Sequence, residues 1–231
     1  MKRNAKKTTL FFVSCALTLS LLSCTPSKLY SADDFDIEVY HSLIDKDGDG
    51  IDDATDILQN VKTYLATSPQ YKSAYYAGGW PTDEYGVCTD VVARGLLGAG
   101  YDLQLLVDED RKAHPEAYQE GEKPDPNIDF RRVRNLFPYF TRNAISLTLD
   151  PKEISEWQPG DIVVWNGHIG VISEHRNKDG VALVYHHLSP GQKNYEQDVL
   201  ETYGTIIGHF RISYSYLTPP YPIISYQPTG Y

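Results

Sequence analysis

The chain has 231 residues, of which 41% are hydrophobic and 23% are charged. This composition is normal for a soluble globular protein and excludes a multi-span membrane protein, a collagen-like fibre and a wholly disordered chain. Three cysteines are too few for a disulfide-rich scaffold. Lys and Arg total 21 against 31 Asp and Glu, which gives a formal charge of −10. A chain this acidic, with no basic cluster in its body, is not expected to bind nucleic acid.

The first 23 residues have the features of a bacterial secretion signal. Residues 1–9 are basic and contain no acid, and the apolar run LFFVSCALTLSLL fills 10–22. This run is too short to span a bilayer comfortably, so it predicts a signal peptide. It ends in Leu-Leu-Ser-Cys, which resembles a lipobox, and Cys24 would then be acylated and begin the mature chain. An ordinary signal peptide with a chance cysteine is the alternative.

A lipid anchor at Cys24 implies a location in the cell envelope. Thr25 rather than Asp follows the cysteine, which in a Gram-negative host favours the outer membrane, facing the periplasm or the cell surface. The expected partner is therefore a membrane, through the anchor.

Beyond the signal, the pattern predicts helices first and an antiparallel sheet afterwards, which is an α+β arrangement. Residues 24–36 are polar and predict a tether. Residues 37–66 predict a short helix over 37–44, an acidic loop and a helix from Ala54. Residues 67–212 form the predicted catalytic domain, and the tail 213–231 is rich in Tyr and Pro. Within the domain we expect helices from Cys88, over 103–118 and after Asp129 as N-cap, and strands at 162–165, 168–173, 181–187 and 206–213.

Cys88 is the one unmodified thiol expected in the mature chain, since Cys15 is removed with the signal and Cys24 carries lipid. It begins a predicted helix, where unpaired N–H groups and the helix dipole stabilise a thiolate. We therefore expect a lowered thiol pKa at Cys88, and the same N–H groups could stabilise an oxyanion. A small buried core residue is the alternative.

A nucleophilic cysteine needs a base, and the base needs a third group that orients its ring. His168 begins one predicted strand, and the next strand ends in His186 and His187. Because strand side chains alternate, only one of these two can share a face with His168. The turn NKDG at 177–180 is typical of a three-residue loop with Gly180 left-handed, which selects His186. A two-residue turn would select His187. The tight register leaves His186 too far along the ladder for a direct bond, so contact needs a longer loop or a strong twist.

Together these motifs resemble the NlpC-type papain-fold cysteine peptidases, which are bacterial cell-wall amidases. More closely, the chain resembles the bacterial family described as domain of unknown function 1287. The matching stretches are Asp52 to Gln59, Gly86 to Asp110, Asp125 to Asn135, Pro159 to Glu174 and His186 to Arg211. The resemblance implies a papain-like fold, with the nucleophile at a helix N-terminus that packs on an antiparallel sheet.

The resemblance also implies the roles of individual residues. Cys88 would be the nucleophile, His168 the general base and later acid, and His186 the orienting residue. Tyr75 resembles a tyrosine that lines the oxyanion site. The implied activity is hydrolysis of an amide bond through a thioester, with peptidoglycan stem peptides as the substrate and no cofactor in catalysis. The alternatives are a non-catalytic, calcium-stabilised wall-binding lipoprotein and a thioester-using acyltransferase. The chain departs from the larger family at Thr89-Asp90, where Ser-Gly is usual.

Two further groups of charged residues could bind ligands. The run DKDGDGIDDATD places acids at positions 1, 3, 5, 9 and 12 of a twelve-residue loop, which predicts a structural calcium site. Its expected ligands are Asp45, Asp47, Asp49, Asp53 and Asp56, and the alternative is a solvated acidic turn. Arg131 and Arg132 could hold a carboxylate of the substrate, and the alternative there is a solvated helix face.

Overall fold

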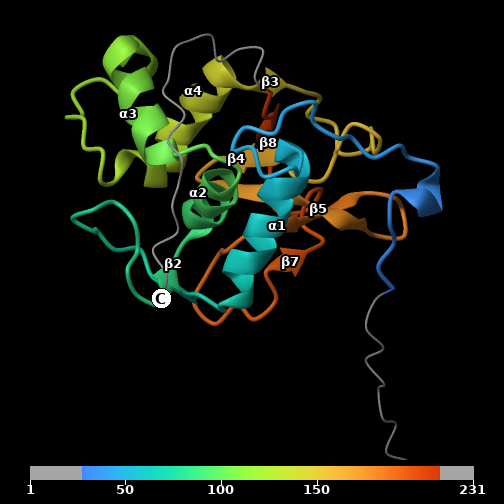
Figure 1. Ribbon diagram of the computed structural model, residues 1–231. Helices are drawn as coiled ribbons and strands as arrows, with labels where there is room; N and C mark the ends of the chain where they lie inside the picture. The colour runs from blue at the N-terminus through green and yellow to red at the C-terminus, as the bar shows by residue number, and fades with distance from the viewer. Residues whose placement is uncertain (1–27, 214–231) are drawn as a thin grey trace, which may run out of the picture.

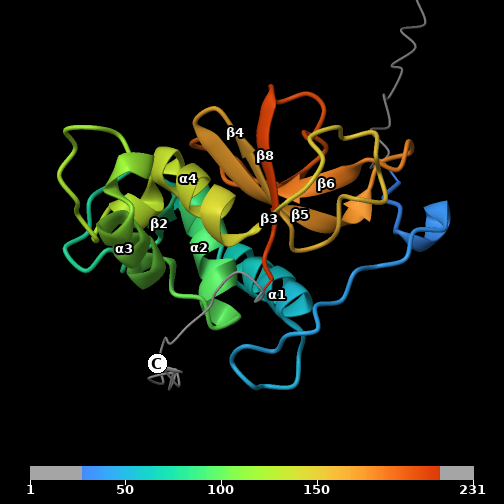
Figure 2. The same ribbon diagram turned by 90° about the horizontal axis from the view of Figure 1, so that it is seen from above.

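The computed structural model describes residues 28–213. The secretion signal, Cys24 and the tail beyond Ser213 lie outside this range, so the lipid anchor and the extended tail stay predictions. Within the described range, four α-helices precede most of the sheet: α1 (Asp53–Ala66), α2 (Cys88–Gly98), α3 (Leu103–Ala113) and α4 (Val133–Asn143). Figure 1 and Figure 2 show these helices gathered on one side of the sheet. The α+β prediction is confirmed. No helix in residues 28–213 is both long and apolar enough to cross a membrane.

The main sheet has six strands in the order β3-β8-β4-β5-β6-β7, and all neighbours are antiparallel. Its strands are β3 (Ile145–Ser146), β4 (Ile162–Trp165), β5 (His168–Arg176), β6 (Ala182–Tyr185), β7 (Glu196–Gln197) and β8 (Ile206–Arg211). Alternate side chains of β4 and β5 pack against the helices, and the others enter a second, smaller core on the opposite face. A separate two-residue parallel pair, β1 (Gln70–Tyr71) with β2 (Tyr85–Gly86), sets Tyr71 opposite Gly86.

The helix α1 begins one residue earlier than the sequence predicts, because Asp52 caps it and accepts a hydrogen bond from the Thr55 N–H. Its buried face is the expected helical repeat of Ile57, Val61 and Leu65. This face packs on α2, whose start at Cys88 is as predicted.

Two helix predictions are wrong. Residues 37–44 contain no helix, and a short 3-10 turn lies earlier, over Asp33–Phe35. Asp129 does not cap α4: it begins a 3-10 turn, Asp129–Arg131, and α4 starts at Val133. The carboxylate of Asp129 instead accepts hydrogen bonds from the Asp125 N–H and from Arg132, so it is occupied by its own loop.

The segment predicted as a tether is attached to the domain from Tyr30 onward. Tyr30 and Arg176 exchange both main-chain hydrogen bonds, of 3.0 and 2.8 Å. Ala32 is buried, and the ring of Phe35 packs on Tyr30. Figure 2 shows this N-terminal stretch, in blue, beside the end of the sheet that carries β5 and β6. It therefore extends the edge of the domain where the β5–β6 hairpin turns.

The hairpin turn has the predicted form, but the register beyond it does not. The Gly180 N–H donates to the Asn177 carbonyl at 3.1 Å, and Gly180 has φ +82°. Arg176 pairs with Ala182, but Ile172 pairs with Val184, so three β5 residues oppose one residue of β6. Because β5 has two extra residues at this bulge, side chains beyond it still point to the same faces as before. The residues at the end of β6 now pair two positions closer to the start of β5.

Candidate active site

Cys88 occupies the first position of α2, and a buried ion pair holds this end of the helix. The Val87 N–H donates to the Asp90 carboxylate at 2.8 Å. Arg131 grips the same carboxylate in a bidentate pair, with Nε to Oδ1 at 2.7 Å and Nη2 to Oδ2 at 2.9 Å. Both side chains are fully buried. The acid at this position thus has a structural role: Asp90 caps the helix, and Arg131 neutralises its charge.

The two predicted partner histidines meet. His168 Nε2 lies 3.0 Å from His186 Nδ1, and His186 Nε2 lies 2.9 Å from Gln197 Oε1. The amide oxygen of Gln197 can only accept, so His186 carries its proton on Nε2. His186 Nδ1 then accepts from His168 Nε2–H, which leaves Nδ1 of the neutral His168 ring free to take a proton. Gln197 therefore fixes the tautomers of both rings.

The bulge in β5 makes this contact possible. Continuing the shifted register places His186 opposite Gly170, two residues from His168 along β5. A Cβ on Gly170 would lie 3.3 Å from His186 Cβ and 2.9 Å from the Tyr185 carbonyl oxygen. Glycine is thus required where β6 crosses close to β5. The choice of His186 over His187 agrees with the structure: His187 lies on the other face, edge-on to Tyr71 and Tyr195 at 5.2 Å from each.

Cys88 reaches the main chain at the start of β5. The N–H groups of Ile169 and Thr89 donate to its thiol. His168 packs on Tyr203, with ring centroids 4.6 Å apart. Burial raises the pKa of both Tyr71 and Tyr203, and the charge of an ionised Cys88 would raise it further. Within residues 28–213 the His168 ring makes no hydrogen bond to Cys88, and it bonds to His186 instead. Tyr203 therefore touches the His168 ring and lies within reach of the Cys88 charge, while no hydrogen bond joins the thiol to the imidazole among residues 28–213.

The prediction of a low thiol pKa disagrees with this environment. Burial raises the pKa of Cys88 to about 11, although N–H donors from Ile169 and Thr89 act in the opposite direction. Burial also lowers the pKa of His168 to about 3. Desolvation disfavours the charged form of each group, so both the Cys88 thiol and the His168 imidazole are neutral at rest. Cys88 still keeps part of its surface open to solvent.

The other predicted substrate residues are placed differently from expectation. Tyr75 is exposed, and its hydroxyl accepts a hydrogen bond from Asn127 Nδ2 at 3.2 Å. Tyr71 takes the place near the thiol instead, because β1 pairs beside Gly86 just ahead of Cys88. Arg131 is buried against Asp90 and is not available to a substrate. Arg132 is also occupied by carboxylates, those of Glu122 at 2.6 Å and Asp129 at 3.2 Å.

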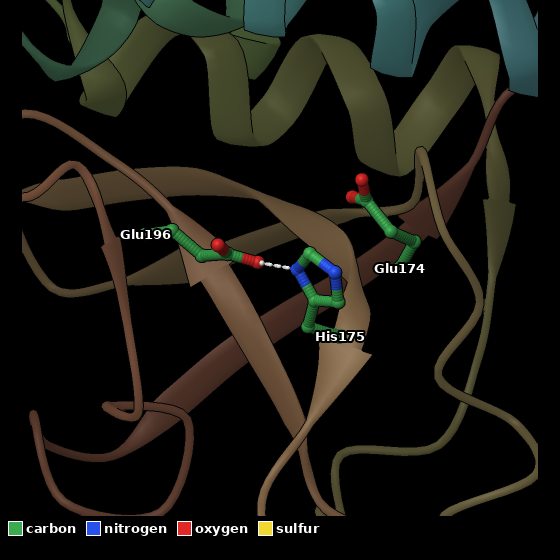
Figure 3. Close-up of side chains that lie close together, drawn as sticks. All are labelled: Glu174, His175 and Glu196. Atoms are coloured by element: carbon green, nitrogen blue, oxygen red, sulfur yellow. Dashed lines mark hydrogen bonds and ion pairs between the residues drawn. The ribbon is translucent and has the colours of Figure 1, made fainter. Parts of the chain in front are cut away.

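Sequence reasoning missed Gln197, because a two-residue strand leaves no periodic signal. The neighbour of Gln197 in β7 is Glu196, whose side chain lies on the other face of the sheet. Glu196 holds β7 in place because it bonds to His175 Nδ1 at 2.7 Å and to the Ser173 hydroxyl. Figure 3 shows His175 between Glu174 and Glu196, with the bond to Glu196. Successive strand residues point to opposite faces, so Glu196 anchors the edge strand while Gln197 reaches His186.

Glu174, His175 and Glu196 are also a set of possible metal ligands, with ligand atoms within 4.8 Å of one another. Their side chains are already partnered, since Lys62 pairs with Glu174 and the His175 ring bonds to Glu196. A hollow of about 280 Å³ lies beside Glu174 and His175 and is lined mainly by apolar residues of the N-terminal segment and α1. It does not include Cys88 or His168.

Three of the five predicted calcium ligands are exposed and lie close together, and the other two are buried. Asp45, Asp47 and Asp49 bring carboxylate oxygens within 4.8 Å of one another. Asp56 lies buried behind them, and burial together with Asp47 and Asp49 raises its pKa to about 7. Asp53 turns away into the domain, where it accepts hydrogen bonds from the Lys46 N–H and the Tyr101 hydroxyl. Asp53 is therefore a support of the loop.

Comparison with known proteins identifies the family. The model of the domain of unknown function DUF1287 matches residues 57–212. The uncharacterized protein YijF of Escherichia coli (strain K12) is 40% identical over 161 residues, which cover 66% of this chain and 77% of YijF. No solved structure matches the chain. The chain belongs to the DUF1287 family, as its sequence motifs predict.

Proposed function

We propose that this member of the DUF1287 family is a papain-like cysteine amidase or peptidase, with peptidoglycan stem peptides as its substrate. The observation that carries the proposal is the chain of hydrogen bonds from His168 through His186 to Gln197, together with a cysteine at a helix start whose thiol accepts from the N–H of Ile169, the residue after His168. A base oriented by a third group next to a thiol is the arrangement that nucleophilic catalysis needs. The proposed location in the cell envelope rests on the lipobox-like segment that ends at Cys24.

The proposed reaction starts from neutral groups. As the Cys88 sulfur attacks the amide carbon, its proton passes to Nδ1 of His168, and the carbonyl oxygen becomes an oxyanion. Backbone N–H groups at the start of α2 and the Tyr71 hydroxyl are the donors on hand for that charge. The C–N bond then breaks, and His168 returns the proton to the leaving amine. Water next gives a proton to His168 and attacks the thioester, which releases the acid and restores the thiol.

Burial of the histidine pair also supports the proposal. A neutral imidazole has a ring nitrogen that can accept a proton, and hydrogen bonds that orient the ring are stronger in a water-poor site. His168 and His186 are each at most 3% exposed. The hydrogen bond from His168 to His186 orients the His168 ring, and this is the role of the third residue in a catalytic triad.

The test is a digest of purified muropeptides by the mature protein, followed by mass spectrometry of the products. We expect fragments with a new amine and a new carboxyl group, and none from Cys88→Ala. His186→Ala should weaken cleavage without removing it. His209→Ala is the matched control, since His209 is equally buried but bonds to Thr148 and Asp161 and lies outside the bonded chain.

Other outcomes separate the alternatives. Transfer of the acyl group to an added amine, in place of hydrolysis, would identify an acyltransferase that shares the first half-reaction. Binding of muropeptides without any product, from a folded protein that cleaves no amide, would replace the enzyme proposal with a wall-binding lipoprotein.

A further inference from the structure

The acidic loop ahead of α1 brings several carboxylates toward one point. Oxygens of Asp45, Asp47 and Asp49 lie within 4.8 Å of one another, and all three side chains are exposed. The loop wraps around Asp45, whose carboxylate accepts the Gly48 N–H at 2.7 Å and the Gly50 N–H at 2.8 Å. Such hydrogen bonds shape a turn, and by themselves they do not indicate a ligand.

The independent indication is Asp56, in the first turn of α1. It is only 5% exposed, and its Oδ1 accepts a hydrogen bond from Asn60 Nδ2 at 2.6 Å. Its Oδ2 is buried and has no hydrogen-bond partner among residues 28–213. A buried carboxylate oxygen without a partner is costly, so it calls for a ligand.

The charged groups that act on the Asp56 carboxyl show what it faces. They are the carboxylates of Asp47, Asp49 and Asp53, all of the same sign. Asp53 has both oxygens engaged, by the Lys46 N–H and by Tyr101. Asn60, the partner of Asp56, lies against Gly98, and Asp47 lies against Gly100, so the Asp56 carboxyl lies next to the acidic loop. A cation is the species that would satisfy its Oδ2 and relieve the repulsion.

We propose that the loop binds one calcium ion through Asp45, Asp47, Asp49 and Asp56, with Asp53 as a support rather than a ligand. The donors are all carboxylate oxygens, three from the loop and one from the first turn of α1, and hard oxygen ligands suit Ca²⁺. The nearby imidazole of His41 is bonded to Asp52 at 3.3 Å and lies outside the set, so the nitrogen and sulfur ligands typical of zinc are missing from it.

The position of the loop assigns the ion a structural role. Asp47 lies against Gly100, just beyond the end of α2, and the other end of that helix carries Cys88. Eleven helical residues separate the two ends by about 15 Å. The ion would therefore tie the start of α1 to the end of α2 and fix the helix pair that positions the nucleophile. It would not contact the reacting atoms.

The experiment measures the melting temperature of the mature protein in EDTA and in calcium, together with calcium binding by titration calorimetry. A single ion selective for the folded state, at a hundredfold excess over its Kd, should raise the melting temperature by roughly 5–10 °C. Asp56→Asn keeps the hydrogen bond to Asn60 and removes a carboxylate ligand. In EDTA this variant should be at least as stable as the parent, because repulsion in the loop falls, and in calcium it should gain little.

Asp53→Asn is the matched control within the loop. It should lower the melting temperature with and without calcium, because it weakens the contact with Tyr101, yet keep the calcium-dependent rise. The proposal is overturned if the parent melts at the same temperature in EDTA and in calcium, or if Asp56→Asn retains the full rise. An equal rise with magnesium at the same concentration would overturn the assignment to calcium.

Discussion

The chemical state of Cys88 gives a prediction that separates burial from catalytic activation. Burial raises the pKa of its thiol to about 11, against about 8.5 for a free cysteine. At pH 8 about one thiol in a thousand would then be ionised, compared with about one in four for a free cysteine. We therefore expect iodoacetamide to label the folded protein about 200-fold more slowly than the unfolded chain at pH 8. The rate should rise about tenfold per pH unit from 7 to 10, because the thiolate is the reactive form.

His168→Ala is the informative variant in this labelling assay. The pKa of His168 is lowered to about 3 by burial, so the ring is neutral at every assay pH and does not stabilise a thiolate by charge. The pH profile of labelling should stay the same in His168→Ala, while any amide cleavage disappears with the base. A plateau of labelling below pH 8.5 in the folded protein would refute the reasoning from burial. If labelling requires denaturant even at pH 10, Cys88 is a packing residue and the nucleophile assignment fails.

Three further predictions follow from the geometry of the site. In the cleavage assay, kcat/KM should hold between pH 8 and pH 5, because the lowered pKa of His168 keeps its basic form until the pH falls toward about 3; a loss centred near pH 6.5 would contradict this. Asp90→Asn leaves the buried charge of Arg131 with a weaker partner and should cost about 3–5 kcal/mol in urea unfolding, whereas a change under 1 kcal/mol would place the pair in solvent. Gly170→Ala should separate the strands and lower both stability and cleavage, since its Cβ would lie 2.9 Å from the Tyr185 carbonyl oxygen and 3.3 Å from His186 Cβ; unchanged kcat/KM would show that the close approach is not needed.

The parts of the site that were predictable are those with a local cause. A helix beginning at Cys88 follows from the apolar spacing after it, and the choice of His186 follows from turn chemistry and the alternation of strand side chains. The family assignment rests on motif order along most of the domain, and the family model confirms it.

What could not be predicted depends on partners far apart in sequence. The bulge in β5 ends at Arg176, whose main chain pairs with Tyr30. The guanidinium of Arg176 donates to three main-chain carbonyls, those of Ile154, Trp157 and Gly180. No periodicity encodes these contacts. Arg131 has helical-surface spacing, yet it is buried because Asp90, 41 residues away, needs a counter-charge.

The pKa prediction for Cys88 was wrong for a related reason. A helix start does supply N–H donors to the sulfur, as expected, but their effect is smaller than that of burial. The depth at which a side chain lies is a property of the whole assembly, and the sequence around Cys88 gives no measure of it.

Gln197 provides a direct test of what orients the His168 ring, because it acts on that ring only through its hydrogen bond to His186. Its Oε1 lies 2.9 Å from His186 Nε2 and so selects the tautomer that leaves His168 Nδ1 unprotonated. Gln197→Leu removes the acceptor but leaves the main-chain pairing with Val184 in place. The lost hydrogen bond is worth about 1 kcal/mol, so kcat/KM should fall about fivefold to tenfold at unchanged melting temperature. Gln197→Glu retains an acceptor and should restore most of that loss. Nitrogen NMR shifts of the His168 ring report the tautomer directly. If Gln197→Leu keeps both the tautomer and the rate, then packing alone orients the histidines, and Gln197 has no part in the site.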